Sequence, residues 1–147
     1  MSGLQLREAV EADVPLIFNF IKGLAEYEKL SDEVYATEAI LSDSLFTKNA
    51  AKVIIASYDD NAAGFALYFY NFSTFTGKRG LYLEDLFILP EFRSKGVGKA
   101  LLKELAQIAE KEDCARMEWV ALDWNTPAIN FYKAMGAVEK NEWTIDW

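Results

Sequence analysis

The order of apolar and polar residues in the early part of the chain predicts a strand followed by a helix. Leu4–Ala9 alternates between apolar and polar residues, as a half-buried strand does. Asp13 and Pro15 mark the start of a helix that is expected to run to about Tyr27. The apolar positions of this helix recur at helical spacing and predict one buried face, formed by Ile17, Phe20, Ile21 and Leu24. A shorter second helix is expected after Thr37.

The middle of the chain changes to a strand pattern and then returns to a helical one. Three apolar runs separated by turn residues predict an antiparallel meander, at Lys52–Tyr58, Gly64–Tyr70 and Gly80–Leu89. After Pro90 the apolar period changes to about 3.6 residues, which predicts a helix, and a strand follows at Arg116–Leu122. Another helix is expected at Thr126–Gly136, before a closing strand near Trp143–Trp147. This order predicts an α/β (α+β) fold.

Length and composition favour one compact domain that spans residues 1–147. A chain of 147 residues with 52% hydrophobic content can bury one sizeable core and has little left for a second. No apolar run approaches the roughly 20 residues that span a bilayer, so we expect a cytoplasmic protein with no membrane partner. Cys114 is the single cysteine, which excludes an internal disulfide and fits a reducing compartment.

The charge and the lack of histidine narrow the chemistry further. A net charge of -8 argues against a nucleic-acid partner, because phosphate contacts need a basic surface, and makes a cationic partner easier. Solubility alone is the alternative explanation of such acidity. The absence of histidine removes the commonest general base and most zinc sites, so no metal is expected. Asp, Glu, Tyr, Cys or ordered water would have to move protons.

The strongest candidate for chemistry is a glycine-rich turn where the third meander strand meets the next helix. Arg93–Lys99, with the sequence RSKGVGK, contains two glycines and three cations. Free backbone N–H groups and the helix dipole make such a turn an anion site that suits a pyrophosphate. It is neither a Walker loop nor a dinucleotide fingerprint. A solvated helix start that happens to contain glycine and lysine is the alternative.

Three segments of the chain resemble a known family. Arg93–Gly98 is similar to the Arg/Gln-x-x-Gly-x-Gly/Ala signature of the GNAT superfamily of N-acetyltransferases, and the order of elements is similar too. Leu81–Phe87 (LYLEDLF) and Trp124–Lys133 (WNTPAINFYK) resemble its diamine branch, the spermidine/spermine and thialysine acetyltransferases. The resemblance implies a mixed, mostly antiparallel central sheet flanked by about four helices, acetyl-CoA as the acetyl donor, and a homodimer.

The resemblance also implies which residues bind the cofactor. Backbone groups of Leu86, Phe87 and Ile88 would pair with the pantetheine arm like an added strand. The phosphates would be held by Arg93, Ser94, Lys95, Gly96, Val97, Gly98 and Lys99. A second contacting segment would be Asn125, Thr126, Pro127 and Ala128. Tyr132 matches the residue that also contacts the cofactor and protonates the departing thiolate; without the resemblance it reads as an ordinary aromatic core residue.

Glu84 is the second residue expected to act in catalysis. Glu84 and Asp85 interrupt an apolar strand, where an ionised carboxylate is costly unless it is paired, hydrated or functional. Successive strand side chains face opposite ways, so only one of the two is expected to address a given cleft. The resemblance selects Glu84 as the residue that contacts the acceptor amine and helps to remove its proton. Two acids satisfied by local hydrogen bonds or lysine partners are the alternative.

The remaining acceptor-binding residues follow from the resemblance alone, and they are Tyr27, Glu28, Glu118, Trp119, Val120 and Glu142. Tyr27 and Glu28 lie in an acidic stretch that could attract a polycation, although a solvated helix end would look similar. Glu118 departs from the residue type expected at its position. The loop Asn71–Gly80 lacks the acid and the Pro-Trp pair of the polyamine enzymes, which weakens a polyamine assignment.

The resulting hypothesis is direct, sequential acetyl transfer from acetyl-CoA to a primary amine of a small di- or polyamine or thialysine-like acceptor. No covalent enzyme intermediate is expected, because Cys114 lies at the far end of the helix that follows the glycine-rich turn. Three alternatives stay open. They are an acetyltransferase for a protein, amino acid or aminoglycoside, a catalytically inactive CoA-binding module, and an interaction protein that uses exposed aromatic residues.

Overall fold

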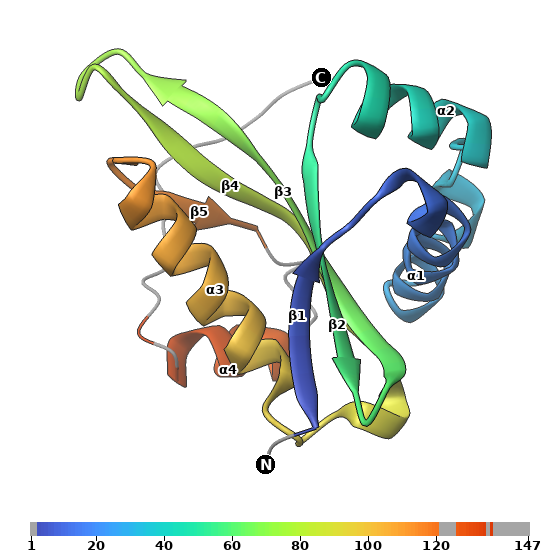
Figure 1. Ribbon diagram of the computed structural model, residues 1–147. Coiled ribbons are helices and arrows are strands. Elements are labelled where there is room, and N and C mark those ends of the chain that lie inside the picture. The colour runs from blue at the N-terminus through green and yellow to red at the C-terminus, as the bar shows by residue number, and fades with distance from the viewer. Residues whose placement is uncertain (1–2, 121–125, 135, 137–147) are drawn as a thin grey trace.

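The fold is built on one five-stranded sheet. The computed structural model describes residues 3–120, 126–134 and 136 (Figure 1). The strands lie in chain order, as β1 (Leu4–Glu8), β2 (Lys52–Tyr58), β3 (Asn61–Ser73), β4 (Lys78–Ile88) and β5 (Met117–Trp119). The first four pair antiparallel, and β5 pairs parallel to β4. The described sheet is therefore mixed and mostly antiparallel, as the resemblance implied.

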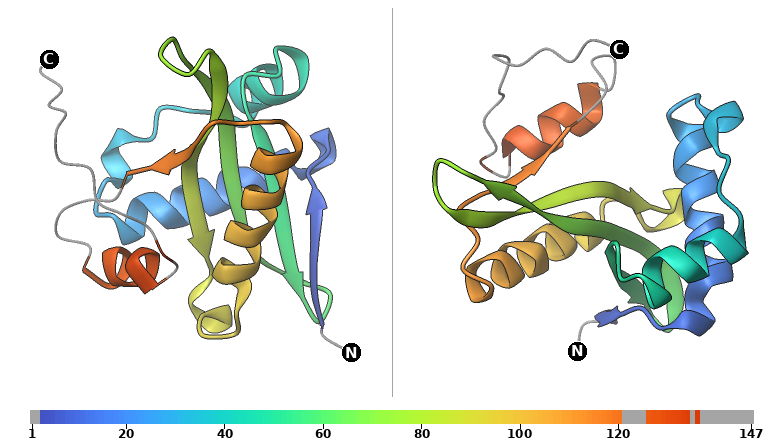
Figure 2. Two further views of the ribbon diagram at one scale, coloured as in Figure 1. Left: turned by 90° about the vertical axis from the view of Figure 1, so that its left-hand side faces the viewer. Right: turned by 90° about the horizontal axis from the view of Figure 1, so that it is seen from above.

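Helices cover both faces of this sheet. They are α1 (Val14–Tyr27), α2 (Glu38–Ser42), α3 (Val97–Lys111) and α4 (Thr126–Ala134). Figures 1 and 2 show α1 and α3 on opposite sides of the twisted sheet. Short 3-10 turns lie at Glu11–Asp13, Ser31–Glu33 and Pro90–Phe92, and a π-helical turn at Asp43–Thr47 continues α2. No helix in the described ranges is long and apolar enough to cross a membrane.

Two hydrophobic cores form because strand side chains alternate between the faces. In β2, Val53 and Ile55 belong to the core under α1, whereas Ile54 and Ala56 belong to the core under α3. Strand β2 is apolar on both faces for this reason. On the α1 side, Phe20 stacks on Phe65 with ring centroids 5.3 Å apart. The two cores hold α1 and α3 against opposite faces of the sheet. The end of α1 and the start of α3 belong to the site described below.

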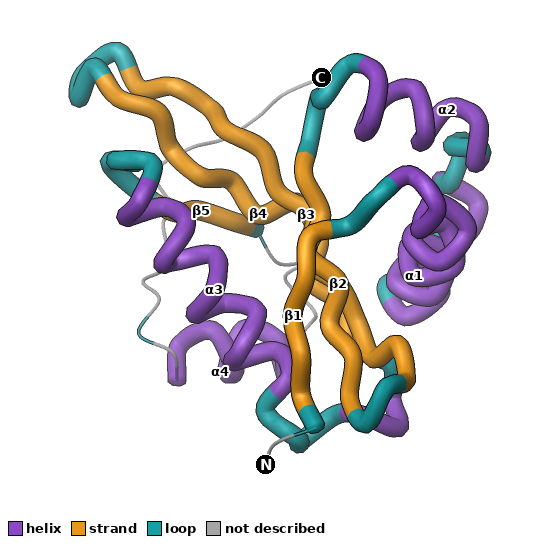
Figure 3. Tube along the Cα trace, viewed as in Figure 1, coloured by secondary structure: helices purple, strands orange, loops and turns teal. Residues whose placement is uncertain are grey.

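The predicted elements that fall on described residues are present, with different lengths at several ends. Strand β3 extends beyond the predicted Gly64–Tyr70 at both ends, and Figure 3 shows the β3–β4 hairpin projecting from the sheet. The predicted strand Arg116–Leu122 is restricted to β5 within the described residues, because β5 pairs with β4 only through Leu81–Leu83. Gly136 has a φ of +93°, as the predicted left-handed stop requires. The predicted strand Trp143–Trp147 lies outside the described residues.

One irregularity in β4 determines the shape of the site. Leu67 of β3 lies opposite Asp85, and the next β3 residue, Tyr68, lies opposite Leu83. Glu84 is therefore an extra residue in β4, which makes this a β-bulge. A bulge re-aims the neighbouring side chains and bends its strand. Beyond this point no strand in the described part of the chain pairs with the outer edge of β4.

Candidate active site

A cleft of about 430 Å³ opens where β4 and β5 diverge. Its walls come from the end of α1, from β4, from the glycine-rich turn before α3, from the end of β5 and from α4. Helix α1 can approach β4 closely because residue 23 is glycine. A Cβ at Gly23 would lie only 2.9 Å from Cε2 of Phe87. The cleft thus joins segments that are far apart in the sequence.

The backbone of β4 forms one wall of the cleft. The N–H group of Leu89 donates to the carbonyl of Ala63 on β3 at 2.8 Å. Backbone groups alternate sides along an antiparallel strand, so the N–H and carbonyl groups of Leu86 and Ile88 face away from β3. Those of Phe87 face β3. An extended ligand in the cleft can therefore pair with Leu86 and Ile88 but not with the backbone of Phe87, although all three were expected to do so.

The glycine-rich turn forms the end of the cleft and begins α3. Ser94 and Gly96 have φ values of +66° and +82°, so the chain turns sharply here and Gly96 caps the helix. The first N–H groups of a helix have no partner within the helix, and those of α3 start at Val97. A Cβ at Gly98 would lie 3.3 Å from Cζ of Phe131, so glycine lets α4 lie against the turn. This geometry suits a phosphate group.

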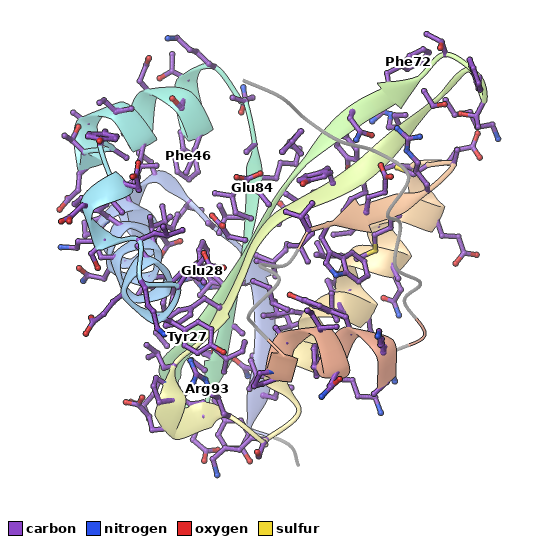
Figure 4. All side chains as sticks on the ribbon, turned by 180° about the vertical axis from the view of Figure 1, so that it is seen from behind. Tyr27, Glu28, Phe46, Phe72, Glu84 and Arg93 are labelled. Atoms are coloured by element: carbon purple, nitrogen blue, oxygen red, sulfur yellow. The ribbon has the colours of Figure 1, made fainter. Side chains whose placement is uncertain are left out.

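Three carboxyl groups line the cleft near α1. Glu84 and Asp85 are both among the residues that line it, and the bulge disturbs the strand alternation at this point, so which of the two carboxylates addresses the cleft stays a prediction. Burial raises the pKa of Asp85 to about 7, and the negative charges of Glu84 and Glu28 contribute to the increase. Burial also raises the pKa of Glu28. Figure 4 shows Glu28 and Glu84 on neighbouring elements at this side of the sheet.

Tyr132 of α4 lies across the cleft from the acids. Burial raises its pKa to about 12, and the charges of Glu28 and Asp85 and the nearby Tyr27 add to the effect. Its ring packs against Trp119, with centroids 5.1 Å apart. The phenol is therefore protonated at neutral pH and can donate a proton into the cleft.

The cleft brings together most of the residues that the sequence selected. Those that line it are Tyr27, Glu28, Glu84, Leu86, Phe87, Ile88, Arg93, Ser94, Gly96, Val97, Gly98, Lys99, Trp119, Val120, Pro127, Ala128 and Tyr132. Asp85 also lines it, although sequence reasoning did not select it. The pair of acids in an apolar strand was the only signal for Asp85 in the sequence. The alternation of strand side chains suggested that only one acid of the pair would face the cleft.

Several selected residues lie elsewhere or point elsewhere. Lys95 is not part of the lining, and its ammonium group lies 5.4 Å from the ring centroid of Tyr58. Glu118 is also outside the lining, where its carboxylate forms an ion pair with Arg116 at 2.9 Å. Thr126 begins α4, but its side chain is not part of what the structure describes.

The remaining predictions concern two residues that the structure does not describe and the question of a metal site. Asn125 and Glu142 lie outside the described residues. Within the described ranges there is no group of three or more His, Cys, Asp or Glu side chains that could hold a metal ion.

Comparisons with known proteins agree on one family. The family model described as Acetyltransferase (GNAT) family matches residues 17–137. A thialysine N-epsilon-acetyltransferase from Sus scrofa is 36% identical, over 97% of this chain and 88% of that protein. An L-ornithine N5-acetyltransferase from Arabidopsis thaliana is 30% identical, over 96% of this chain and 82% of that protein. The solved structure of an integron cassette protein from V. cholerae matches with a TM-score of 0.79 and 29% identity, over 100% of this chain and 94% of that one.

Proposed function

The chain belongs to the GNAT family of acetyltransferases, and we propose that this enzyme transfers the acetyl group of acetyl-CoA to a primary amine of a small di- or polyamine or thialysine-like acceptor. The acceptors share a terminal primary amine on a short alkyl chain with a second amino group. Thialysine and ornithine, which the names of two relatives carry, fit this description as well as polyamines do.

The observation that carries the proposal is the convergence of Glu28, Glu84 and Asp85 on one cleft that Tyr132 closes from the other side. Three carboxyl groups that repel one another are stabilised by a cation between them. An alkylammonium group supplies that charge, and apolar residues that line the cleft, such as Leu24 and Trp119, suit its alkyl chain.

The residues around the cleft fit acetyl-CoA. The outward backbone groups of Leu86 and Ile88 can bond a pantetheine amide, and the N–H groups at the start of α3, together with Lys99, can hold its phosphates. Pro127 and Ala128 at the start of α4 line the opposite wall. When bound, the cofactor supplies an acetyl group on an activated thioester.

The reaction needs two proton transfers, one from the acceptor amine and one to the leaving thiolate, and different side chains carry them out. The acceptor amine must lose its proton before it can attack, and Glu84 and Asp85 lie where they can take that proton, directly or through water. Asp85, with a pKa of about 7, is close to half ionised at neutral pH and is matched to this task. The hydroxyl of Tyr132 donates its proton to the departing thiolate sulfur. No covalent enzyme intermediate is needed, so Cys114 takes no part.

The test is a thiol-release assay with acetyl-CoA and a panel of spermidine, spermine, putrescine, thialysine, ornithine and an aminoglycoside. We expect turnover on one or more alkyl amines, and a strong loss in Tyr132→Phe. Tyr35→Phe removes the hydroxyl of an exposed tyrosine that is not among the residues lining the cleft and is the matched control. Turnover on the aminoglycoside alone, or on a protein substrate alone, would replace the proposed acceptor. CoA binding without any turnover would indicate a catalytically inactive binding module.

The proposal extends to the state of the protein in the cell. We propose one domain that acts in the cytoplasm without a metal, as the composition of the sequence favours, and that forms a homodimer, as the family resemblance implies. Sedimentation equilibrium of the purified protein tests the dimer, and a monomer at micromolar concentration would refute it.

A further inference from the structure

The side chain of Arg93 contacts segments outside the glycine-rich turn to which the residue belongs. It follows the 3-10 turn Pro90–Phe92 and begins the glycine-rich turn. Its Nε atom donates to the carbonyl of Ile88 at 3.1 Å. Its guanidinium also lies 5.1 Å from the ring centroid of Tyr27 and 5.9 Å from that of Phe87. Figure 4 shows Arg93 and Tyr27 close together at the end of α1. One side chain of the glycine-rich turn thus contacts two other walls of the cleft, β4 and the end of α1.

The contacts of Arg93 belong to the two halves of the reaction. The carbonyl of Ile88 faces the part of the cleft where the cofactor arm is proposed to bind. Tyr27 is the last residue of α1, and the next residue is Glu28, one of the carboxyl groups on the acceptor side. A guanidinium over an aromatic face is attractive, and it restricts both side chains. Arg93 therefore connects the start of the glycine-rich turn to the end of α1, which is followed directly by Glu28.

We infer that Arg93 is a positioning residue that couples cofactor binding to acceptor binding, and this inference rests on the proposed function. Phosphates bound by the glycine-rich turn hold Arg93 in place, because it is the first residue of that turn. Arg93 then holds Tyr27 and the end of α1, so that Glu28 is fixed in the cleft before the amine arrives. Coupling between two binding sites is reciprocal, so a bound amine also strengthens cofactor binding.

The size of the coupling follows from the contact that carries it. A cation–π contact at an exposed site changes an equilibrium constant by about two- to fivefold. CoA is therefore expected to strengthen amine binding by about that factor, and loss of the contact removes it. A catalytic role would instead lower the turnover number. The two cases separate in the kinetics, because a positioning role raises the KM for the amine while kcat changes little.

The first test uses CoA alone and measures hydrogen exchange in the segment 21–30. In the wild type, saturating CoA is expected to slow exchange at the end of α1. The variants Arg93→Met and Tyr27→Leu should lose this protection, each at its own saturating CoA concentration. Lys95→Met is the matched control, because Lys95 lies in the same turn and contacts Tyr58 outside the cleft. It should keep the protection even if its CoA affinity falls.

Two outcomes would overturn the inference. One is equal protection in the wild type and in Arg93→Met. The other is an absence of CoA-dependent protection in the wild type, which would mean that the turn and α1 are independent. Arg93→Lys retains a cation and should recover part of the effect. If Arg93→Met is unfolded by circular dichroism, Arg93→Lys and Tyr27→Leu provide the comparison.

The second test measures the coupling itself by calorimetry. Spermidine and thialysine are titrated into the wild type with and without CoA, and CoA should lower the dissociation constant for at least one of them by about two- to fivefold. The ratio should fall to about one in Arg93→Met, and the double variant with Tyr27→Leu should show no further loss. A ratio that Arg93→Met leaves unchanged would refute the coupling. Failure of every amine to bind or react would refute the proposed function, and the hydrogen-exchange result would still decide the role of Arg93.

Discussion

Replacing Asp85 by asparagine should stabilise the folded protein at neutral and alkaline pH. Burial and the charges of Glu84 and Glu28 raise the pKa of Asp85 from 3.8 to about 7. An acid with a higher pKa in the folded protein binds more protons when folded, so its contribution to stability is greatest at low pH. That stability is lost as the pH rises from about 4 towards 7. An asparagine side chain at this position carries no charge and would avoid the loss.

The magnitude follows from the two pKa values. The difference between 3.8 and about 7, at about 1.36 kcal/mol for each pKa unit, gives an upper figure of about 4 kcal/mol above pH 7. Asp85→Asn should therefore exceed the wild type in its free energy of unfolding at pH 8 by up to that amount. At pH 4 the two proteins should be nearly equal. Removal of the carboxyl group should also lower kcat/KM, because the cleft loses a proton acceptor.

The assay is urea unfolding followed by circular dichroism at pH 4, 5, 6, 7 and 8. Asp32→Asn is the matched control, because Asp32 is exposed in the turn Ser31–Glu33 and is not among the residues that line the cleft, and its replacement changes the net charge equally. A stability difference between Asp85→Asn and the wild type that does not grow between pH 4 and pH 7 would refute the reasoning. So would an equal gain in Asp32→Asn, which would assign the effect to net charge.

Three further substitutions test other parts of the site. Tyr132→Phe should lower kcat by about a hundredfold or more with little change in the dissociation constant for CoA, because a general acid contributes on this scale. An unchanged kcat in initial-rate assays would show that Tyr132 is not the general acid. Cys114→Ala should leave kcat within about twofold, and an inactive variant would contradict direct transfer. Gly64→Ala should destabilise the fold by about 1–3 kcal/mol in urea unfolding, because the new Cβ would meet the carbonyl oxygen of Phe87 on the neighbouring strand; unchanged stability would show that β4 can shift.

The parts of the fold that the sequence predicted well are those set by local pattern. Helix α1 ends at Tyr27 as predicted, because its apolar positions recur at helical spacing. Strand β2 has its predicted bounds, because it is a short continuous apolar run followed by turn residues. The glycine-rich turn was found for a similar reason, since glycine is needed where φ is positive, as at Gly96. The cleft-lining residues at the start of α3 followed directly from that turn.

The parts that the sequence did not predict depend on pairing between distant segments. The bulge at Glu84 arises from the register of β4 against β3, which no alternation within β4 reveals. Asp85 was missed for that reason. The direction of the Arg93 side chain depends on where α1 ends in space, and its partner Tyr27 is far away in the sequence.

The raised pKa values of Asp85 and Tyr132 should make the cleft respond to the proposed amine substrate. Both are raised by burial and by neighbouring negative charge, so a cation in the cleft lowers both. A bound ammonium group therefore favours the ionised form of Asp85, the form that can accept a proton. The acid limb of kcat/KM reports the free enzyme and is expected near pH 7, whereas the acid limb of kcat reports the complex and is expected at lower pH. Identical limbs in the two profiles would show that the substrate cation does not reach Asp85.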